Sequence, residues 1–331
     1  MLLREFKRTG PLTIFLIIVI LILLWVGAFY RIRRQFSWYF DIDSMPFYEF
    51  MSGLTGTHPV PGIAFSFLLV GLMAFLVVNL NTSLFFINER TFLPALFYIL
   101  ITALVPHYQV MNPAIFAAVF LMLAIRRIMD SYRVQGTAYC FFDAGILISI
   151  GSLFYANLVW FSSLIFIGMS LLRTWSIKEI VVSFLGLLTP FVLTPAIYYV
   201  FGEDPETIFS MFAYNLFGRH SLSTFGIVII AGFFVTSILT LVAISHLLAT
   251  INSKKIQSRK TFFLLLWVFF ISIAVYMMMP SVSAEMIWIT SIPVSYFLSH
   301  YFVFQKKKIS EIIFSVFLFV ILFVQIWYLT K

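Results

Sequence analysis

The stretch "LTIFLIIVILILLWVGAFY", residues 12–30, decides the fold class of this chain because it contains no charged residue. About 20 predominantly apolar residues are what an α-helix needs to cross the hydrocarbon core of a membrane. The run is longer than the apolar region of a typical signal peptide, and Arg31, Arg33 and Arg34 follow it instead of a small-residue cleavage site. We therefore expect an uncleaved membrane anchor.

The composition of the whole chain extends this expectation to a multi-spanning protein. Of its 331 residues, 62% are hydrophobic and only 10% are charged, far less charge than a soluble domain of this length needs to cover its surface. The single cysteine, Cys140, allows no internal disulfide and no thiolate metal cluster. The sequence predicts an all-α, polytopic membrane helix bundle that forms one domain over residues 1–331.

The apolar segments divide the chain into about eleven predicted transmembrane helices. They are expected at residues 11–30, 60–81, 92–106, 113–127, 139–155, 157–172, 180–200, 222–249, 261–279, 286–303 and 310–329.

The distribution of basic residues predicts the orientation. With a cytoplasmic N-terminus, sixteen of the 21 Lys and Arg residues lie on the cytoplasmic side, as the positive-inside rule requires. The five that remain outside are Arg31, Arg33, Arg34, Arg219 and Lys331. The net charge of +8 is then mostly a topology signal that also attracts anionic lipid, and no basic stripe in a soluble region suggests nucleic acid as a partner.

This orientation leaves two outer connectors long enough to hold structure, residues 31–59 and 201–221. In the first, Asp43 or Ser44 can cap a short helix that has Pro46 in its first turn and ends at Gly53. In the second, the dipeptide Asp204–Pro205 predicts a helix start and Gly218 a helix stop. Its apolar positions predict a helix lying in the membrane interface.

Three carboxylates, Asp41, Asp43 and Glu49, are concentrated in the first outer connector. Two carboxylates two residues apart, such as Asp41 and Asp43, can share a divalent cation, and one of them can serve instead as a general base toward a hydroxyl acceptor. The alternative interpretation is that they are solvated loop residues that balance the nearby arginines and cap a helix.

The second outer connector contributes the pair Arg219–His220. An arginine at the interface can hold a phosphate with two hydrogen bonds, and a histidine can donate a proton. His107, in a different outer turn, could join the same pocket. The alternative is an ordinary contact with lipid headgroups.

Motifs of soluble enzymes are missing from the sequence, which has no phosphate-binding glycine loop, no GxSxG, no HExxH and no paired CxxC. Pro190 and Pro195 interrupt an apolar segment and could mark a broken helix at a transport site, although prolines more often only kink a helix.

Three phrases give the chain a resemblance to a family of uncharacterised multi-spanning inner-membrane proteins of Bacteroidetes. They are "NERTFLPALFYILI" (88–101), "FFDAGILISIGSLFY" (141–155) and "WSIKEIVVSFLGLLTPFVL" (175–193). The resemblance implies a multi-pass protein of the bacterial cytoplasmic (inner) membrane and carries no function.

The plan of the chain also resembles that of GT-C-fold glycosyltransferases, which use polyprenyl-phosphate-linked sugars. The resemblance implies that Asp41 or Asp43 acts as base or metal ligand and that Arg219 and His220 hold the donor phosphate. Many such enzymes carry a further acid between the third and fourth spans, but here that turn is "PHYQVMNP" (106–113), without a carboxylate.

The sequence is therefore compatible with three alternative functions. The first is transfer of a sugar from a polyprenyl-phosphate donor to an acceptor at the outer face of the membrane. The second is a non-catalytic subunit that binds other membrane proteins in an envelope complex. The third is a transporter or flippase for a lipid-linked substrate.

Overall fold

The structure is a computed structural model that describes residues 2–7, 9–30, 43–55, 58–132, 136, 138–172, 177–202, 204–218, 225–305 and 308–330. Its described residues form helices, turns and irregular segments, with no strand among them. In this part of the chain, seven helical segments are long and apolar enough to cross a membrane. These are α2 (Pro11–Tyr30), α4 (Pro59–Leu84), α9 (Ile177–Val200), α11 (Ile227–Thr250) continued by η4 (Ile251–Ser253), α12 (Ile256–Met278), η5 (Ala284–Met286) continued by α13 (Ile287–Phe304), and α14 (Lys308–Thr330). The chain is thus built as a multi-pass membrane protein.

Four further helices lie at the other predicted spans. They are α5 (Leu93–Thr102), α6 (Pro113–Asp130), α7 (Ala138–Ser152) and α8 (Ser163–Leu172). Three of these are short, and α6 carries Arg126, Arg127 and Asp130 near its end. The described helices therefore support seven spans directly, and the predicted number of eleven stays a prediction.

The remaining helical segments are short and lie at the ends of the long ones. They are α1 (Leu2–Lys7), α3 (Pro46–Thr55), α10 (Glu206–Phe217), η2 (Pro106–Tyr108) and η3 (Ala156–Ser162).

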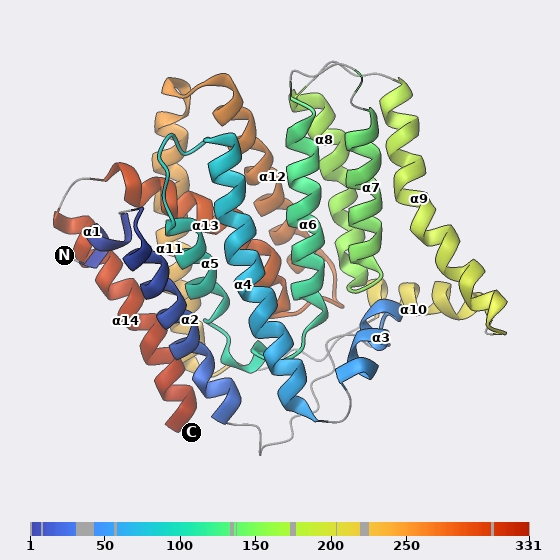
Figure 1. The fold of residues 1–331 in the computed structure, drawn as a ribbon, viewed down its shortest axis with the longest axis horizontal. Helices are drawn as coiled ribbons and strands as arrows, with labels where there is room; N and C mark the ends of the chain where they lie inside the picture. The colour runs from blue at the N-terminus through green and yellow to red at the C-terminus, as the bar shows by residue number, and fades with distance from the viewer. Residues whose placement is uncertain are drawn as a thin grey trace.

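Helix α13 forms the centre of the bundle. It packs against α5, α6, α11 and α12. In its most apolar 18-residue stretch 83% of the residues are buried, compared with 22% in the corresponding stretch of α9. Trp288, Tyr296, Phe297 and Phe302 of α13 are completely or almost completely buried. A helix that is apolar all round and this deeply buried is the core element around which the others assemble. Figure 1 shows α9 at the right-hand edge of the bundle, where its apolar surface is exposed.

The connecting segments gather at two ends of the bundle (Figure 1). We define the Asp43 end as the one that contains Asp43, α3, α10, η2, η3 and η5, at the bottom of Figure 1. We define the Lys254 end as the one that contains η4 and Lys254, at the top of the same view.

Helices α7 and α9 approach each other unusually closely at two glycines. A β-carbon at Gly145 would lie 2.8 Å from the carbonyl oxygen of Ser183, and one at Gly186 would overlap the carbonyl oxygen of Phe142. Small residues at such a crossing allow backbones to touch, which is how helices gain packing energy where lipid supplies no hydrophobic driving force. Both Gly145 and Gly186 are therefore required by the packing of α9 onto the bundle.

We expect Gly186→Ala to lower the free energy of unfolding by about 1–3 kcal/mol, because the added methyl group must push α9 away from α7. Gly71→Ala is the matched control, since nothing lies within 4 Å of a β-carbon at Gly71 in the helix α4. That control should be neutral or stabilising, as glycine is unfavourable within helices. Thermal unfolding in detergent measures both, and equal behaviour of the two variants would contradict the close α7–α9 contact.

Candidate functional site

The structure describes three of the six predicted site residues. Asp43 and Glu49 are exposed at the Asp43 end, Asp43 just before α3 and Glu49 within it, and His107 lies in η2. The other three, Asp41, Arg219 and His220, lie outside the described residues. Whether all six converge is therefore still a prediction.

The two outer connectors predicted from the sequence meet directly through Asp43 and Asn215. The side-chain oxygen of Asn215, on α10, accepts a hydrogen bond from the backbone N–H of Asp43 (3.1 Å). Its amide nitrogen donates to the backbone carbonyl of Asp43 (2.6 Å). Asn215 is only 2% exposed, so this two-way pair fixes the backbone of Asp43 while its carboxylate faces outward.

Two more buried polar residues tie this pair to the rest of the Asp43 end. The amide of Asn157, in η3, donates to the backbone carbonyl of Asn215 (3.2 Å) and to the hydroxyl oxygen of Ser281 (3.3 Å). The Ser281 hydroxyl in turn donates to the carbonyl of Leu216 (3.0 Å). A chain of hydrogen bonds thus runs from Asp43 through α10 to the segment that enters η5.

A buried carboxylate, Glu285, lies at the end of that segment and is 1% exposed. It accepts hydrogen bonds from the Tyr155 hydroxyl (3.2 Å), from the Ser283 backbone N–H (3.3 Å) and from the Ser283 hydroxyl. The hydroxyls of Tyr108 and Ser283 lie 3.1 Å apart. Burying a carboxylate is costly unless it is hydrogen-bonded, and these donors meet that requirement. We call Tyr108, Tyr155, Ser283 and Glu285 the Glu285 cluster.

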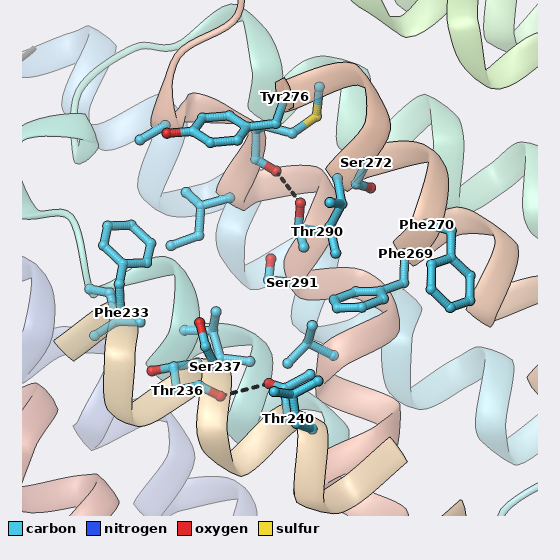
Figure 2. A pocket seen from close by; sticks show the side chains of 18 of the residues that line it. Phe233, Thr236, Ser237, Thr240, Phe269, Phe270, Ser272, Tyr276, Thr290 and Ser291 are labelled. Atoms are coloured by element: carbon cyan, nitrogen blue, oxygen red, sulfur yellow. Dashed lines mark hydrogen bonds between the residues drawn. The ribbon is translucent and has the colours of Figure 1, made fainter. Parts of the chain in front are cut away.

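A cavity of about 670 Å³ lies next to the Glu285 cluster, between α11 and α12 with α13 behind it (Figure 2). Ala284 and Met286, which flank Glu285, line it, and so does Phe225, whose ring lies 6.4 Å from that of Tyr108. The cavity reaches Thr240 and Leu241, halfway along α11. We call it the α11–α12 groove, and its volume is within the range of about 300–1,000 Å³ that ligand pockets occupy.

The walls of the α11–α12 groove are mostly carbon. Hydroxyl groups do occur, but Thr236 donates to the carbonyl of Gly232 (2.8 Å), Thr240 to that of Thr236 (2.8 Å) and Thr290 to that of Met286 (3.0 Å). Figure 2 shows two of these bonds returning to the helices that carry the hydroxyls. Three of the hydroxyls that line the groove are thus engaged within their own helices, and the mostly apolar walls suit a long apolar chain.

A second hollow of about 600 Å³ lies between α3 and α10. Its lining includes Glu49, Phe50, Tyr198 and Thr207. Glu49 therefore faces a concave surface at the Asp43 end, separate from the α11–α12 groove.

His107 points away from the Glu285 cluster. Its ring lies 4.4 Å from that of Tyr328 on α14, whereas its neighbour Tyr108 reaches Ser283. Successive residues of a 3₁₀ helix project about a third of a turn apart, which separates the two side chains. The ring of His107 thus contacts α14 and not the Glu285 cluster.

Helix α9 runs without interruption through both Pro190 and Pro195. The described chain thus shows a continuous helix where a broken one would line a transport site. Among the described residues, no group of three or more His, Cys, Asp or Glu side chains could hold a metal ion.

These observations define a multi-pass helical membrane protein with a mostly apolar groove of about 670 Å³ beside the Glu285 cluster. The chain belongs to a family of unknown function, DUF6427, whose sequence pattern matches residues 12–331. No curated protein and no solved structure matches this chain.

We expect Asn215→Leu to loosen the segment around Asp43, because the variant removes both hydrogen bonds to the Asp43 backbone. The loss of buried hydrogen bonds costs about 1–3 kcal/mol, so exchange of the Asp43 amide hydrogen should accelerate at least about fivefold. Hydrogen–deuterium exchange with mass spectrometry measures it. Ser210→Ala, at an exposed position of α10, is the control that should leave the rate unchanged. An unchanged rate in Asn215→Leu would contradict the proposed anchoring.

Proposed function

We propose that this protein is a GT-C-like membrane glycosyltransferase that takes a sugar from a polyprenyl-phosphate donor. The reaction takes place at the outer face of the bacterial cytoplasmic membrane, and the Asp43 end is the outer end. The observation that supports this proposal best is the α11–α12 groove, which ends beside the Glu285 cluster.

The orientation rests on eleven spans with a cytoplasmic N-terminus. The helices α5, α6, α7 and α8, together with η3, then cross the membrane beside the seven long ones. This arrangement brings the described basic residues to the Lys254 end, in agreement with the positive-inside rule. They include Arg90, Arg126, Arg127, Lys178, Lys255, Arg259 and Lys260.

The groove would receive the polyprenyl chain from the side, since it lies between two membrane-facing helices. The phosphate and sugar would then lie at the outer membrane surface, near Asp43 and the Glu285 cluster. The predicted phosphate-binding residues Arg219 and His220 would hold the phosphate there.

In the proposed reaction, a hydroxyl oxygen of the acceptor forms a bond to the anomeric carbon of the sugar. The bond from that carbon to the phosphate oxygen breaks, and its electron pair leaves with the polyprenyl phosphate. The acceptor proton passes to the carboxylate of Asp43 or Asp41 acting as general base. Positive charge from Arg219 would stabilise the leaving phosphate.

Glu285 has a positioning role in this proposal, because its oxygens are already engaged by Tyr155 and Ser283. It fixes η5, and with it Ala284 and Met286, at the outer end of the groove. The proposal includes a divalent cation that Asp41 and Asp43 would hold. Its positive charge would help Arg219 to stabilise the donor phosphate.

A flippase for a lipid-linked substrate is a second candidate, and one observation favours it. The contact between α11 and α13 that forms the back of the groove continues toward the Lys254 end, where His246 of α11 lies against His300 of α13. A flippase would move the lipid along this seam, whereas a transferase would consume it at the outer surface.

We expect reconstituted protein to release polyprenyl phosphate from at least one member of a panel of polyprenyl-phosphate-linked hexoses when membrane extract supplies the acceptor. The double variant Asp41→Asn, Asp43→Asn should reduce this rate about 100-fold or more, the usual contribution of a general base. Mass spectrometry of the released lipid gives the rate. Full activity in the double variant, or no release with any donor, would contradict the proposal.

The groove has its own matched pair of variants. Ser237→Trp places an indole in the α11–α12 groove and should raise the donor KM at least about tenfold. Ile238→Trp, at the next residue, faces the membrane outside the groove lining and should have little effect. Equal effects of the two variants would show that the donor does not bind in the groove. Movement of intact donor across the bilayer would favour the flippase.

A further inference from the structure

A cluster of nitrogen-bearing side chains lies at the Lys254 end, far from the site described above. His246 of α11 and His300 of α13 have ring centroids 5.5 Å apart. Lys254, between α11 and α12, places its amine 4.6 Å from the ring centre of Phe304 and 5.6 Å from that of Phe262. His300 contacts the same two rings, at 4.9 Å and 5.3 Å. We call His246, Lys254 and His300 the His–Lys cluster.

The packing leaves hydrogen-bonding groups of this cluster unsatisfied. His300 is 1% exposed, yet neither of its ring nitrogens has a hydrogen-bond partner among the described residues. Within the same part of the chain, Nδ1 of His246 also lacks one. Buried polar groups without partners are costly and rare in native proteins, so a group from outside the protein is expected here.

The charge of the cluster indicates what kind of group fits. Lys254 forms no ion pair within the described chain, where the only salt bridge found joins Arg127 and Asp143. Burial lowers the pKa of the Lys254 amine to about 8, so its charge is costly without an anion nearby. A metal cation would be repelled by the ammonium group. An anion would be attracted to it and could accept hydrogen bonds from the imidazoles.

The position of the cluster indicates the chemical class of the anion. It lies where α11, α12 and α13 reach the Lys254 end, and the same three helices form the α11–α12 groove further along. At a membrane surface, phosphate groups are the abundant anions, and basic residues there strengthen binding to anionic lipid. A lipid whose phosphate sits at Lys254 could lay its chains along this seam.

We propose that His246, Lys254 and His300 form a binding site for a phosphate group, either the headgroup of an anionic phospholipid or a free phosphate ester. The site lies at the opposite end of the bundle from the Glu285 cluster. It does not depend on the proposed glycosyl transfer.

Purified protein in a phosphate-free maltoside detergent tests this inference with two probes, phosphatidylglycerol and inorganic phosphate. We expect phosphatidylglycerol to raise the midpoint of thermal unfolding by several degrees. The shift should fall to less than a third in Lys254→Gln and in His300→Phe. Lys255→Gln, which removes the exposed neighbouring lysine, is the matched control and should keep the shift. A shift with lipid alone identifies a headgroup site, and a shift with both probes identifies a site for any phosphate.

His300→Phe also separates a binding role from a structural one. Because phenylalanine removes two unsatisfied nitrogens from an aromatic environment, this variant should unfold no more easily than the wild type in the absence of probe. A large loss of stability without probe would show that the imidazole is structural and overturn the proposal.

A second measurement follows Lys254 itself in the unmutated chain and needs a variant only to assign its resonance. Reductive ¹³C-methylation of lysines, with Lys254→Gln to assign the resonance, reports the pKa of Lys254 by NMR. Binding of the probe should raise that pKa from about 8. The proposal would be overturned if neither probe changed the pKa of Lys254, or if Lys255→Gln lost the thermal shift as fully as Lys254→Gln. Binding of Zn²⁺ in place of both probes would also overturn it.

Discussion

The hydrocarbon core of a membrane offers no hydrogen bonds, and the rest of the structure depends on this constraint. Within the long helices most hydroxyls satisfy it locally, as Thr236, Thr240 and Ser272 do by donating to carbonyls one turn earlier. Tyr296 satisfies it across the bundle, by donating to the carbonyl of Val77 (2.8 Å). Other polar groups depart from this local pattern, and two clusters of them lie near the two ends of the bundle.

The two ends solve this problem in different ways. At the Asp43 end, Glu285, Asn157 and Asn215 are held in a hydrogen-bonded network that joins segments far apart in the sequence. At the Lys254 end, His300 is buried with both nitrogens unsatisfied among the described residues, beside a lysine that has no described counter-charge. Hydrogen bonds join separate segments at the first end, whereas the second end leaves buried nitrogens without partners among the described residues. The α11–α12 groove lies between them.

Local features of the fold were predictable from the sequence because their signals are local. The apolar run at 12–30 gave α2, and Asp204 and Gly218 marked the ends of α10: Asp204 accepts a hydrogen bond from the Glu206 N–H (3.0 Å), and Gly218 follows the last helical residue. The predicted stop at Gly53 was wrong, because α3 continues to Thr55. A glycine can remain within a helix when its neighbours keep the backbone bonds.

Tertiary features were not predictable, because apolar helices in lipid specify their partners weakly. The Glu285 cluster draws its members from three separate turns, and no spacing in the sequence relates these turns to one another. His300 lies within the apolar segment "SYFLSHYF", where nothing in the spacing marks it. The resemblance in plan implied that Asp43, Arg219 and His220 serve one reaction, but Asn215, which joins Asp43 to α10, carried no signal of its own.

In the proposed function, a lipid-linked phosphate occupies the α11–α12 groove with its polar end at the Asp43 end. Photo-crosslinking with a polyprenyl phosphate that carries a diazirine in its chain, followed by peptide mapping, tests it most directly. We expect saturable labelling of residues 225–241 and 269–294, competed by unlabelled polyprenyl phosphate. Labelling spread over the exposed faces of α9 and α14, or labelling that does not saturate, would contradict it.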